Sequence, residues 1–164
     1  MSSLRCRLLS LGLRLVEKPR LARARDPRAV RAQFERAARL FPTPRGATYA
    51  DDPLGPIPAL RCAIQGAEHG GAILYLHGGA YLMGSRGTHR HLAAALAGAA
   101  GATAWLPDYR LAPEHPFPAM VEDALACWRA LLARGADPAR AAVAGDSAGG
   151  GLVFALLAAA RAEG

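Results

Sequence analysis

The feature that most constrains the fold is a tight turn, the pentapeptide GDSAG at residues 145–149. Residues 140–144 before it form a short apolar run typical of a buried strand, and residues 148–161 after it are rich in Ala and Leu, as in a helix. A serine between a strand and a helix in such a turn has a strained backbone, and the flanking glycines avoid Cβ clashes. The pattern predicts a strand–turn–helix unit that presents the Ser147 hydroxyl at the carboxyl end of a sheet.

Strands and helices are predicted to alternate along the chain after residue 58. Strands are expected at 59–65, 72–77, 102–106 and 140–144, and helices at 88–98 with Thr88 as its cap, from Pro118 to Gly135, and at 148–161. This order predicts an α/β fold with a mostly parallel sheet and helices on both of its faces. The preceding residues 46–58, rich in Pro, Gly and Asp, are predicted to be a loop.

Two amphipathic helices are predicted near the N-terminus. Residues 4–16 carry leucines at helical spacing, and a second helix begins at Pro27 with Asp26 as its cap. We expect both apolar stripes to pack onto the rest of the protein in preference to a membrane surface. The chain is thus divided into a helical segment, residues 1–45, and an α/β segment, residues 46–164.

The turn at residues 145–149 also indicates chemistry, because a serine at the start of a helix can act as a nucleophile. Backbone N–H groups of the following helix, together with its dipole, point toward an oxyanion that develops beside the serine. A second motif, HGGAY at residues 77–81, follows the strand 72–77 and can supply further N–H donors. We expect His77 to orient this loop by hydrogen bonds and not to act as a base.

A third motif, DYRLAPEHPFPA at residues 108–119, places charged residues between prolines and predicts an ion-paired loop. Together with HGGAYLMGS and GDSAGG, and in this order, it closely resembles the hormone-sensitive-lipase family of α/β-hydrolases, including bacterial esterases. The resemblance extends from about residue 50 to about residue 160.

The resemblance implies an α/β-hydrolase fold and hydrolysis of carboxylic esters through an acyl-enzyme. It implies that Ser147 is the nucleophile and that the N–H groups of Gly78, Gly79 and Ala148 form the oxyanion hole. The residues expected to support this site are His77, Asp146, Arg110 and Glu114. It also implies that residues 1–45 are a helical cap over the acyl pocket, with Tyr81 and Met83 near the rim of that pocket.

The residues after Ser147 depart from the family pattern, in which an acid and then a histidine follow the serine. Only Glu163 is acidic there, no histidine follows, and all five histidines precede Ser147. We therefore expect the triad acid and histidine not to be in this chain, and the fold to be incomplete, with its C-terminal strands missing. The chain alone is expected to be inactive, and strand 140–144 is expected to be an exposed, aggregation-prone sheet edge.

The sequence also suggests two alternative functions. The motif GDSAGG is similar to the GDSGG of chymotrypsin-like proteases, but helical periodicity beside Ser147 argues against that all-β fold. The second is a non-catalytic, degenerate hydrolase-like binding module, which the missing acid and base favour and the intact glycine-rich motifs oppose. The same groups could also act on amides or lactones in place of esters.

Charge and composition limit the partners. Residues 1–45 carry a net charge of +9 and residues 46–164 a net charge of −2, so the basic character belongs to one segment and does not indicate nucleic-acid binding. Three widely spaced cysteines predict reduced thiols and a cytoplasmic location, and no apolar run is long enough for stable membrane insertion. We expect no metal and no cofactor, and a small ester substrate with a short to medium acyl chain.

Overall fold

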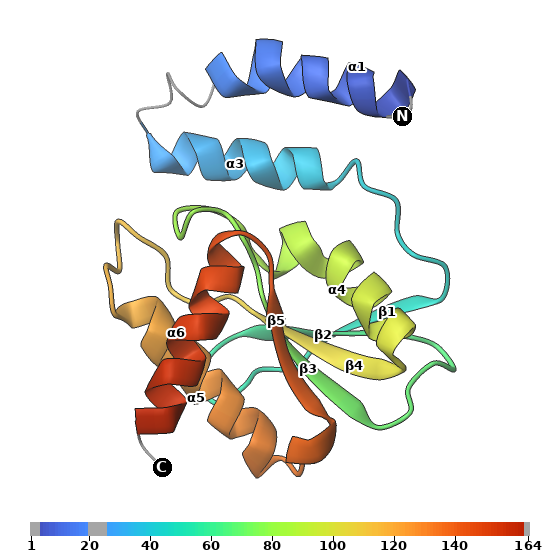
Figure 1. The fold of residues 1–164 in the computed structure, drawn as a ribbon, viewed down its shortest axis with the longest axis vertical. Helices are drawn as coiled ribbons and strands as arrows, with labels where there is room; N and C mark the ends of the chain where they lie inside the picture. The colour runs from blue at the N-terminus through green and yellow to red at the C-terminus, as the bar shows by residue number, and fades with distance from the viewer. Residues whose placement is uncertain (1–3, 20–25, 163–164) are drawn as a thin grey trace.

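The computed structural model describes residues 4–19 and 26–162, which form a five-stranded sheet flanked by helices (Figure 1). The helices are α1 (Leu4–Gly12), α3 (Pro27–Ala38), α4 (Arg86–Ala100), α5 (Ala119–Ala133) and α6 (Ala148–Ala162), with a π-helical segment η1 (Leu13–Glu17) and a 3-10 turn η2 (Pro138–Arg140). The strands are β1 (Ala47–Asp51), β2 (Ala59–Ile64), β3 (Gly71–Leu76), β4 (Ala102–Pro107) and β5 (Ala141–Gly145). The α/β class predicted from the alternation of elements is confirmed.

The sheet is mixed, with the strand order β1-β2-β4-β3-β5. The predicted parallel part consists of β4, β3 and β5, whereas β2 joins β4, and β1 joins β2, in antiparallel pairing. Strand β1 lies in the segment 46–58, so the prediction of a continuous loop there was wrong. Its five residues pair with β2, Ala47 opposite Ile64, and such short edge pairing leaves little apolar periodicity to detect.

Alternate residues of β3 build two cores on opposite faces of the sheet. Leu74 and Leu76 face the larger core, where they pack with buried residues of α5 and α6. Ile73 and Tyr75 face the second core and pack with the buried alanines of α4. Because both faces of β3 are buried, the sequence of this strand is a continuous apolar run.

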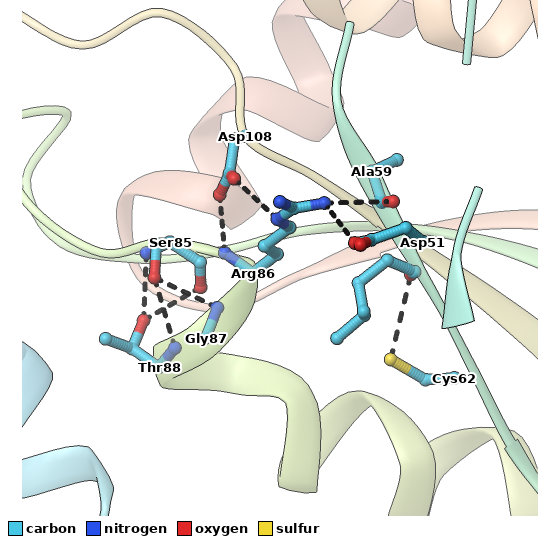
Figure 2. Close-up of polar contacts among 9 residues, drawn as sticks. Asp51, Ala59, Cys62, Ser85, Arg86, Gly87, Thr88 and Asp108 are labelled. Carbon is cyan, nitrogen blue, oxygen red and sulfur yellow. Dashed lines mark hydrogen bonds and ion pairs between the residues drawn. The ribbon is translucent and has the colours of Figure 1, made fainter. Parts of the chain in front are cut away.

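Helix α4 begins at a capping box that differs from the prediction. Ser85, not Thr88, is the N-cap: its hydroxyl accepts from the N–H groups of Gly87 (3.0 Å) and Thr88 (3.2 Å). The Thr88 hydroxyl in turn accepts from the Ser85 N–H at 2.9 Å, as Figure 2 shows. Thr88 is therefore the third helical residue, three positions after the cap. The predicted cap of α3 is confirmed, since Asp26 accepts from the Arg28 N–H.

The first residue of α4, Arg86, ties the helix to three strands (Figure 2). Its N–H donates to Asp108, just after β4, at 2.7 Å, and its guanidinium pairs with the same carboxylate at 2.9 Å. The guanidinium also pairs with Asp51 of β1 at 2.7 Å and donates to the carbonyl of Ala59 in β2. Burial raises the pKa of Asp108, an effect that the hydrogen bond and charge of Arg86 oppose. The carboxyl ends of β1 and β4 and the amino end of β2 are thereby fixed to the start of α4.

Helix α1 lies beyond α3, on the side away from the sheet (Figure 1). Its predicted apolar stripe is exposed, with Leu4, Leu8, Leu11 and Leu15 each more than half accessible, so the expectation that this stripe packs onto the rest of the protein was wrong. Over residues 4–19 and 26–162, none of the helices has the length and apolar character needed to cross a membrane.

Strand β5 lies at the edge of the sheet, as predicted for strand 140–144. It pairs with β3, and within the described part of the chain no strand lies on its other side. Beside it, α6 leaves Phe154 and Leu157 exposed.

The start of α6 packs against the end of β3 so closely that Gly149 has no room for a side chain. A Cβ there would overlap the Leu76 carbonyl oxygen and lie 2.7 Å from that of His77. We predict that Gly149→Ala lowers the free energy of unfolding by about 2 kcal/mol or more, as overpacking against backbone atoms does. Urea denaturation measures this change.

Gly150→Ala is the matched control. Its Cβ would lie 3.5 Å from the nearest atom, an ordinary contact, so the substitution should change stability by less than about 1 kcal/mol and in the stabilising direction. Equal destabilisation by the two variants would contradict the close packing of α6 on β3.

Candidate active site

Ser147 occupies the turn between β5 and α6 with a left-handed backbone, φ +51°, and its side chain is exposed. A non-glycine residue in this region is strained, as expected for a serine in such a turn. The turn opens into a cavity of about 420 Å³, which we call the site cavity. Ser147 lines this cavity from the turn. The other lining residues are Gly79, Ala80 and Met83 from the loop after β3, and Leu13, Val30, Gln33, Phe34 and Ala37 from the N-terminal segment.

The loop after β3, residues 77–85, is tightly wound. Gly79 (φ +125°), Ala80 (φ +55°) and Tyr81 (φ +59°) are consecutive residues with positive φ. The N–H groups of Leu82 and Met83 both donate to the Gly79 carbonyl at 3.0 Å, and a Cβ on Gly79 would collide with the Met83 carbonyl. A glycine is therefore required where the loop turns its backbone toward Ser147.

The Asp146 carboxylate joins this loop to the turn that carries Ser147. One oxygen, Oδ1, accepts from the Gly78 N–H at 2.9 Å and from the Tyr75 hydroxyl at 2.9 Å, and lies 3.6 Å from His89 Nε2. The Gly78 N–H, expected in the oxyanion hole, is thus engaged by Asp146, while Gly79 and Ala80 line the cavity beside Ser147. Burial, with the nearby carboxylate, raises the pKa of Tyr75 and keeps its hydroxyl a donor.

His77 lies under the loop, fully buried. Its ring is stacked on Tyr109 (centroids 4.3 Å apart) and on His89 (5.5 Å), and its Nδ1 is 2.9 Å from the Gly78 carbonyl oxygen. The Tyr109 hydroxyl donates to the His77 carbonyl at 2.6 Å. Burial lowers the pKa of His77 to about 4, so the ring is neutral at pH 7 and its Nδ1–H can donate to Gly78.

The histidines are engaged by groups other than Ser147. Among the described residues, no histidine forms a hydrogen bond with the Ser147 hydroxyl: His77 and His89 face the groups named above, and His91 lies 3.1 Å from the Tyr49 hydroxyl. Nor do the ranges 4–19 and 26–162 group three His, Cys, Asp or Glu side chains so that they could hold a metal ion.

The charged residues of the loop 108–118 pair with other elements. Arg110 binds Asp123 (2.7 Å) and Glu122 (3.0 Å) on α5, so it anchors the base of this loop to the helix that follows. The Ala112 N–H donates to the Tyr81 carbonyl at 2.9 Å and joins the loop to the one after β3. The loop is thus ion-paired to the helix that follows it and hydrogen-bonded to the loop after β3.

Arg31 of α3, which sequence reasoning missed, holds both loops. Its guanidinium binds the two Glu114 oxygens at 2.8 and 2.6 Å and donates to the carbonyls of Leu82 and Ala112, each at 2.6 Å. The hydrogen bond from Arg31 lowers the pKa of Glu114 to about 2. Nineteen arginines occur in the chain, so nothing in the sequence distinguished this one. Helix α3 is thereby fixed over the site cavity.

Comparisons with known proteins place these features in a family context. A family profile described as the alpha/beta hydrolase fold matches residues 73–164. An acetyl-hydrolase of Streptomyces hygroscopicus is 54% identical over 97 residues, which are 59% of this chain and 32% of that protein. An ethyl acetate hydrolase of Pseudomonas putida is 48% identical over 91 residues, 53% of this chain and 29% of that protein.

The structural comparison extends further along the chain. The crystal structure of a hormone-sensitive lipase from a metagenome library matches with a TM-score of 0.87 and 40% identity, covering 96% of this chain and 51% of that one. The chain therefore spans about half of that structure and about a third of the length of the two curated relatives.

The bridge formed by Asp146 can be tested by removing its acceptor. Asp146→Ala leaves the Gly78 N–H and the Tyr75 hydroxyl without their partner, so we predict a loss of about 1–3 kcal/mol in the free energy of unfolding. Asp146→Asn keeps one acceptor oxygen and should lose less than about 1 kcal/mol. Urea denaturation distinguishes these outcomes, and equal stability of the alanine variant and the wild type would contradict the bridge.

The buried His77 predicts that stability falls in mild acid. In the unfolded state its pKa is near 6.5, so as the pH falls the unfolded chain binds a proton before the folded chain does. Between pH 7.5 and pH 5 this should lower the free energy of unfolding by about 2 kcal/mol. Urea denaturation at the two pH values measures the fall.

His77→Phe is the control for this effect, because it keeps an aromatic ring and cannot titrate. Burial also lowers the pKa of His89, so a smaller fall should persist in that variant. An identical pH dependence in the variant and the wild type would show that His77 is not buried as a neutral ring.

Proposed function

The chain belongs to the hormone-sensitive-lipase family of α/β-hydrolases, and from this premise we propose that the complete protein hydrolyses carboxylic esters through an acyl-enzyme on Ser147. The family and the fold predicted from the three sequence motifs are confirmed by the matches. The observation that carries the proposal is the strained, exposed Ser147, which lines the site cavity together with Gly79 and Ala80. Such a turn holds a serine hydroxyl out from the end of a sheet.

In the proposed reaction, Ser147 Oγ attacks the ester carbonyl and its proton passes to a base, which returns it to the departing alcohol. Water then attacks the acyl-serine and releases the acid. The oxyanion formed in each half is stabilised by N–H groups of Ala148, at the start of α6, and of Gly79 and Ala80 in the loop after β3. Gly78 contributes indirectly, because its N–H fixes the loop to Asp146.

The supporting residues are proposed to position these groups. Asp146 and His77 hold the loop after β3, Arg110 holds the base of the loop 108–118, and Glu114 receives Arg31 from α3. Residues 1–45 are proposed to be a cap, since α3 forms a wall of the site cavity, and residues 46–164 to belong to the hydrolase core.

We propose that the histidine base and its acid are supplied from outside residues 1–164. No histidine follows Ser147 in the sequence, and no imidazole of the described residues forms a hydrogen bond with its hydroxyl. The 164-residue chain by itself is therefore proposed to have negligible esterase turnover.

The substrate is proposed to be a small ester with a short to medium acyl chain. The names of two relatives, an acetyl-hydrolase and an ethyl acetate hydrolase, refer to short acyl groups. The site cavity of about 420 Å³ fits a substrate of that class.

The nucleophile is tested in the complete gene product with p-nitrophenyl butyrate as substrate. We predict that Ser147→Ala lowers kcat by about 10⁴-fold or more, because the acyl-enzyme cannot form. Ser10→Ala, an exposed change on α1, serves as the matched control and should retain activity. Full activity in the Ser147 variant would overturn the assignment.

Two further outcomes would change the proposal in different ways. A folded complete protein that hydrolyses no ester would favour a non-catalytic binding module. Ordinary turnover by the 164-residue chain, abolished by Ser147→Ala, would show that the base lies within residues 1–164.

A further inference from the structure

A second cavity of about 480 Å³ lies between α3 and α4. We call it the α3–α4 cavity. Its lining is mostly apolar and includes Phe41 and Pro42, after α3, together with Leu92 and Ala95 of α4. His89 also lines it, and burial lowers the pKa of this ring, which favours its neutral form beside an apolar ligand.

The two cavities share a wall. Phe34 and Ala37 of α3 line both the site cavity and the α3–α4 cavity, so the two spaces are neighbours on either side of these residues. Ala37 contributes only a methyl group to this wall, whereas Phe34 contributes an aromatic ring. The centroid of that ring lies 6.0 Å from the centroid of the His89 ring, and the two ring planes are tilted by 53°. One partly buried aromatic ring is therefore the main partition between Ser147 and the second cavity.

We propose that the α3–α4 cavity is a binding site for the far end of an alkyl chain of the substrate, and that Phe34 determines how long a chain is accepted. This rests on the proposed ester hydrolysis at Ser147. Burial of methylene groups in an apolar cavity makes the binding free energy of a ligand more favourable. An alkyl chain is the part of an ester that such a lining can bind. With Phe34 in place, chains that end within the site cavity are favoured.

The test compares ester chain lengths in the complete gene product. Phe34→Ala should connect the two cavities and raise the ratio of kcat/KM for p-nitrophenyl decanoate to that for p-nitrophenyl acetate by tenfold or more. Each methylene group newly buried is worth roughly fourfold. A parallel series of acetate esters with ethyl to decyl alcohols shows whether the acyl or the alcohol chain enters the second cavity.

Two variants control for a general loosening of α3. Ala95→Trp fills the α3–α4 cavity from α4, where Ala95 lies outside the site cavity, so the double variant Phe34→Ala/Ala95→Trp should lose the gained ratio. Ala32→Gly weakens α3 at an exposed residue that lines neither cavity, and should leave the ratio within about twofold. An unchanged ratio in Phe34→Ala, or a gain that Ala95→Trp does not remove, would overturn the proposal.

Binding of decanoate, measured by calorimetry, separates this inference from the proposed function. Tighter binding to Phe34→Ala, reversed by Ala95→Trp, would support the second cavity even if no ester were hydrolysed. Hydrolysis of acetate esters by the wild type, with decanoate binding equal in all variants, would leave the esterase proposal intact and overturn the role of the α3–α4 cavity.

Discussion

The carboxylate of Asp146 is the contact on which the candidate site depends. Strands β3 and β5 are parallel neighbours, with Leu76 opposite Gly145, so the loops at their carboxyl ends emerge side by side. Asp146 converts that proximity into a fixed geometry, because a single oxygen accepts from Gly78 in one loop and from Tyr75 in the strand below it. As a result, the strained turn at Ser147 and the tightly wound loop at Gly79 lie at a fixed distance from each other.

Much of the fold could be predicted from the sequence because its elements carry local signals. Buried strands are apolar runs, the Asp26 cap precedes a proline, and the glycines beside Ser147 occur where backbone atoms crowd. Strand β1 carried no such signal, since its residues are half-exposed and are held by pairing with β2. The cap of α4 was misplaced by three residues because Ser85 and Thr88 are both good capping residues, and their reciprocal hydrogen bonds decide between them.

The position of the site could be predicted from the sequence, but the contacts within it could not, because many of them join residues that are far apart in the chain. The loop 108–118 was expected to be ion-paired, and its partners lie on three different helices, α3, α4 and α5. Arg31 could be identified only from structure, where one guanidinium reaches Glu114 and two carbonyls. Likewise, the hydrogen bond from Gly78 to Asp146 depends on the relative placement of two strands, which motif spacing does not specify.

Because of the position of α3, the space offered to a ligand can change during evolution separately from the sheet that carries the proposed catalytic groups. The sheet carries Ser147 and the backbone donors, whereas α3 supplies walls to both cavities and is attached to the loops mainly through Arg31. Mutations within the short coding stretch for Pro27–Ala38 can therefore remodel the space offered to a ligand while the sheet beneath is inherited unaltered. Exchange of that stretch between related genes would transfer a preference for ligand shape as a unit, provided that Arg31 is retained.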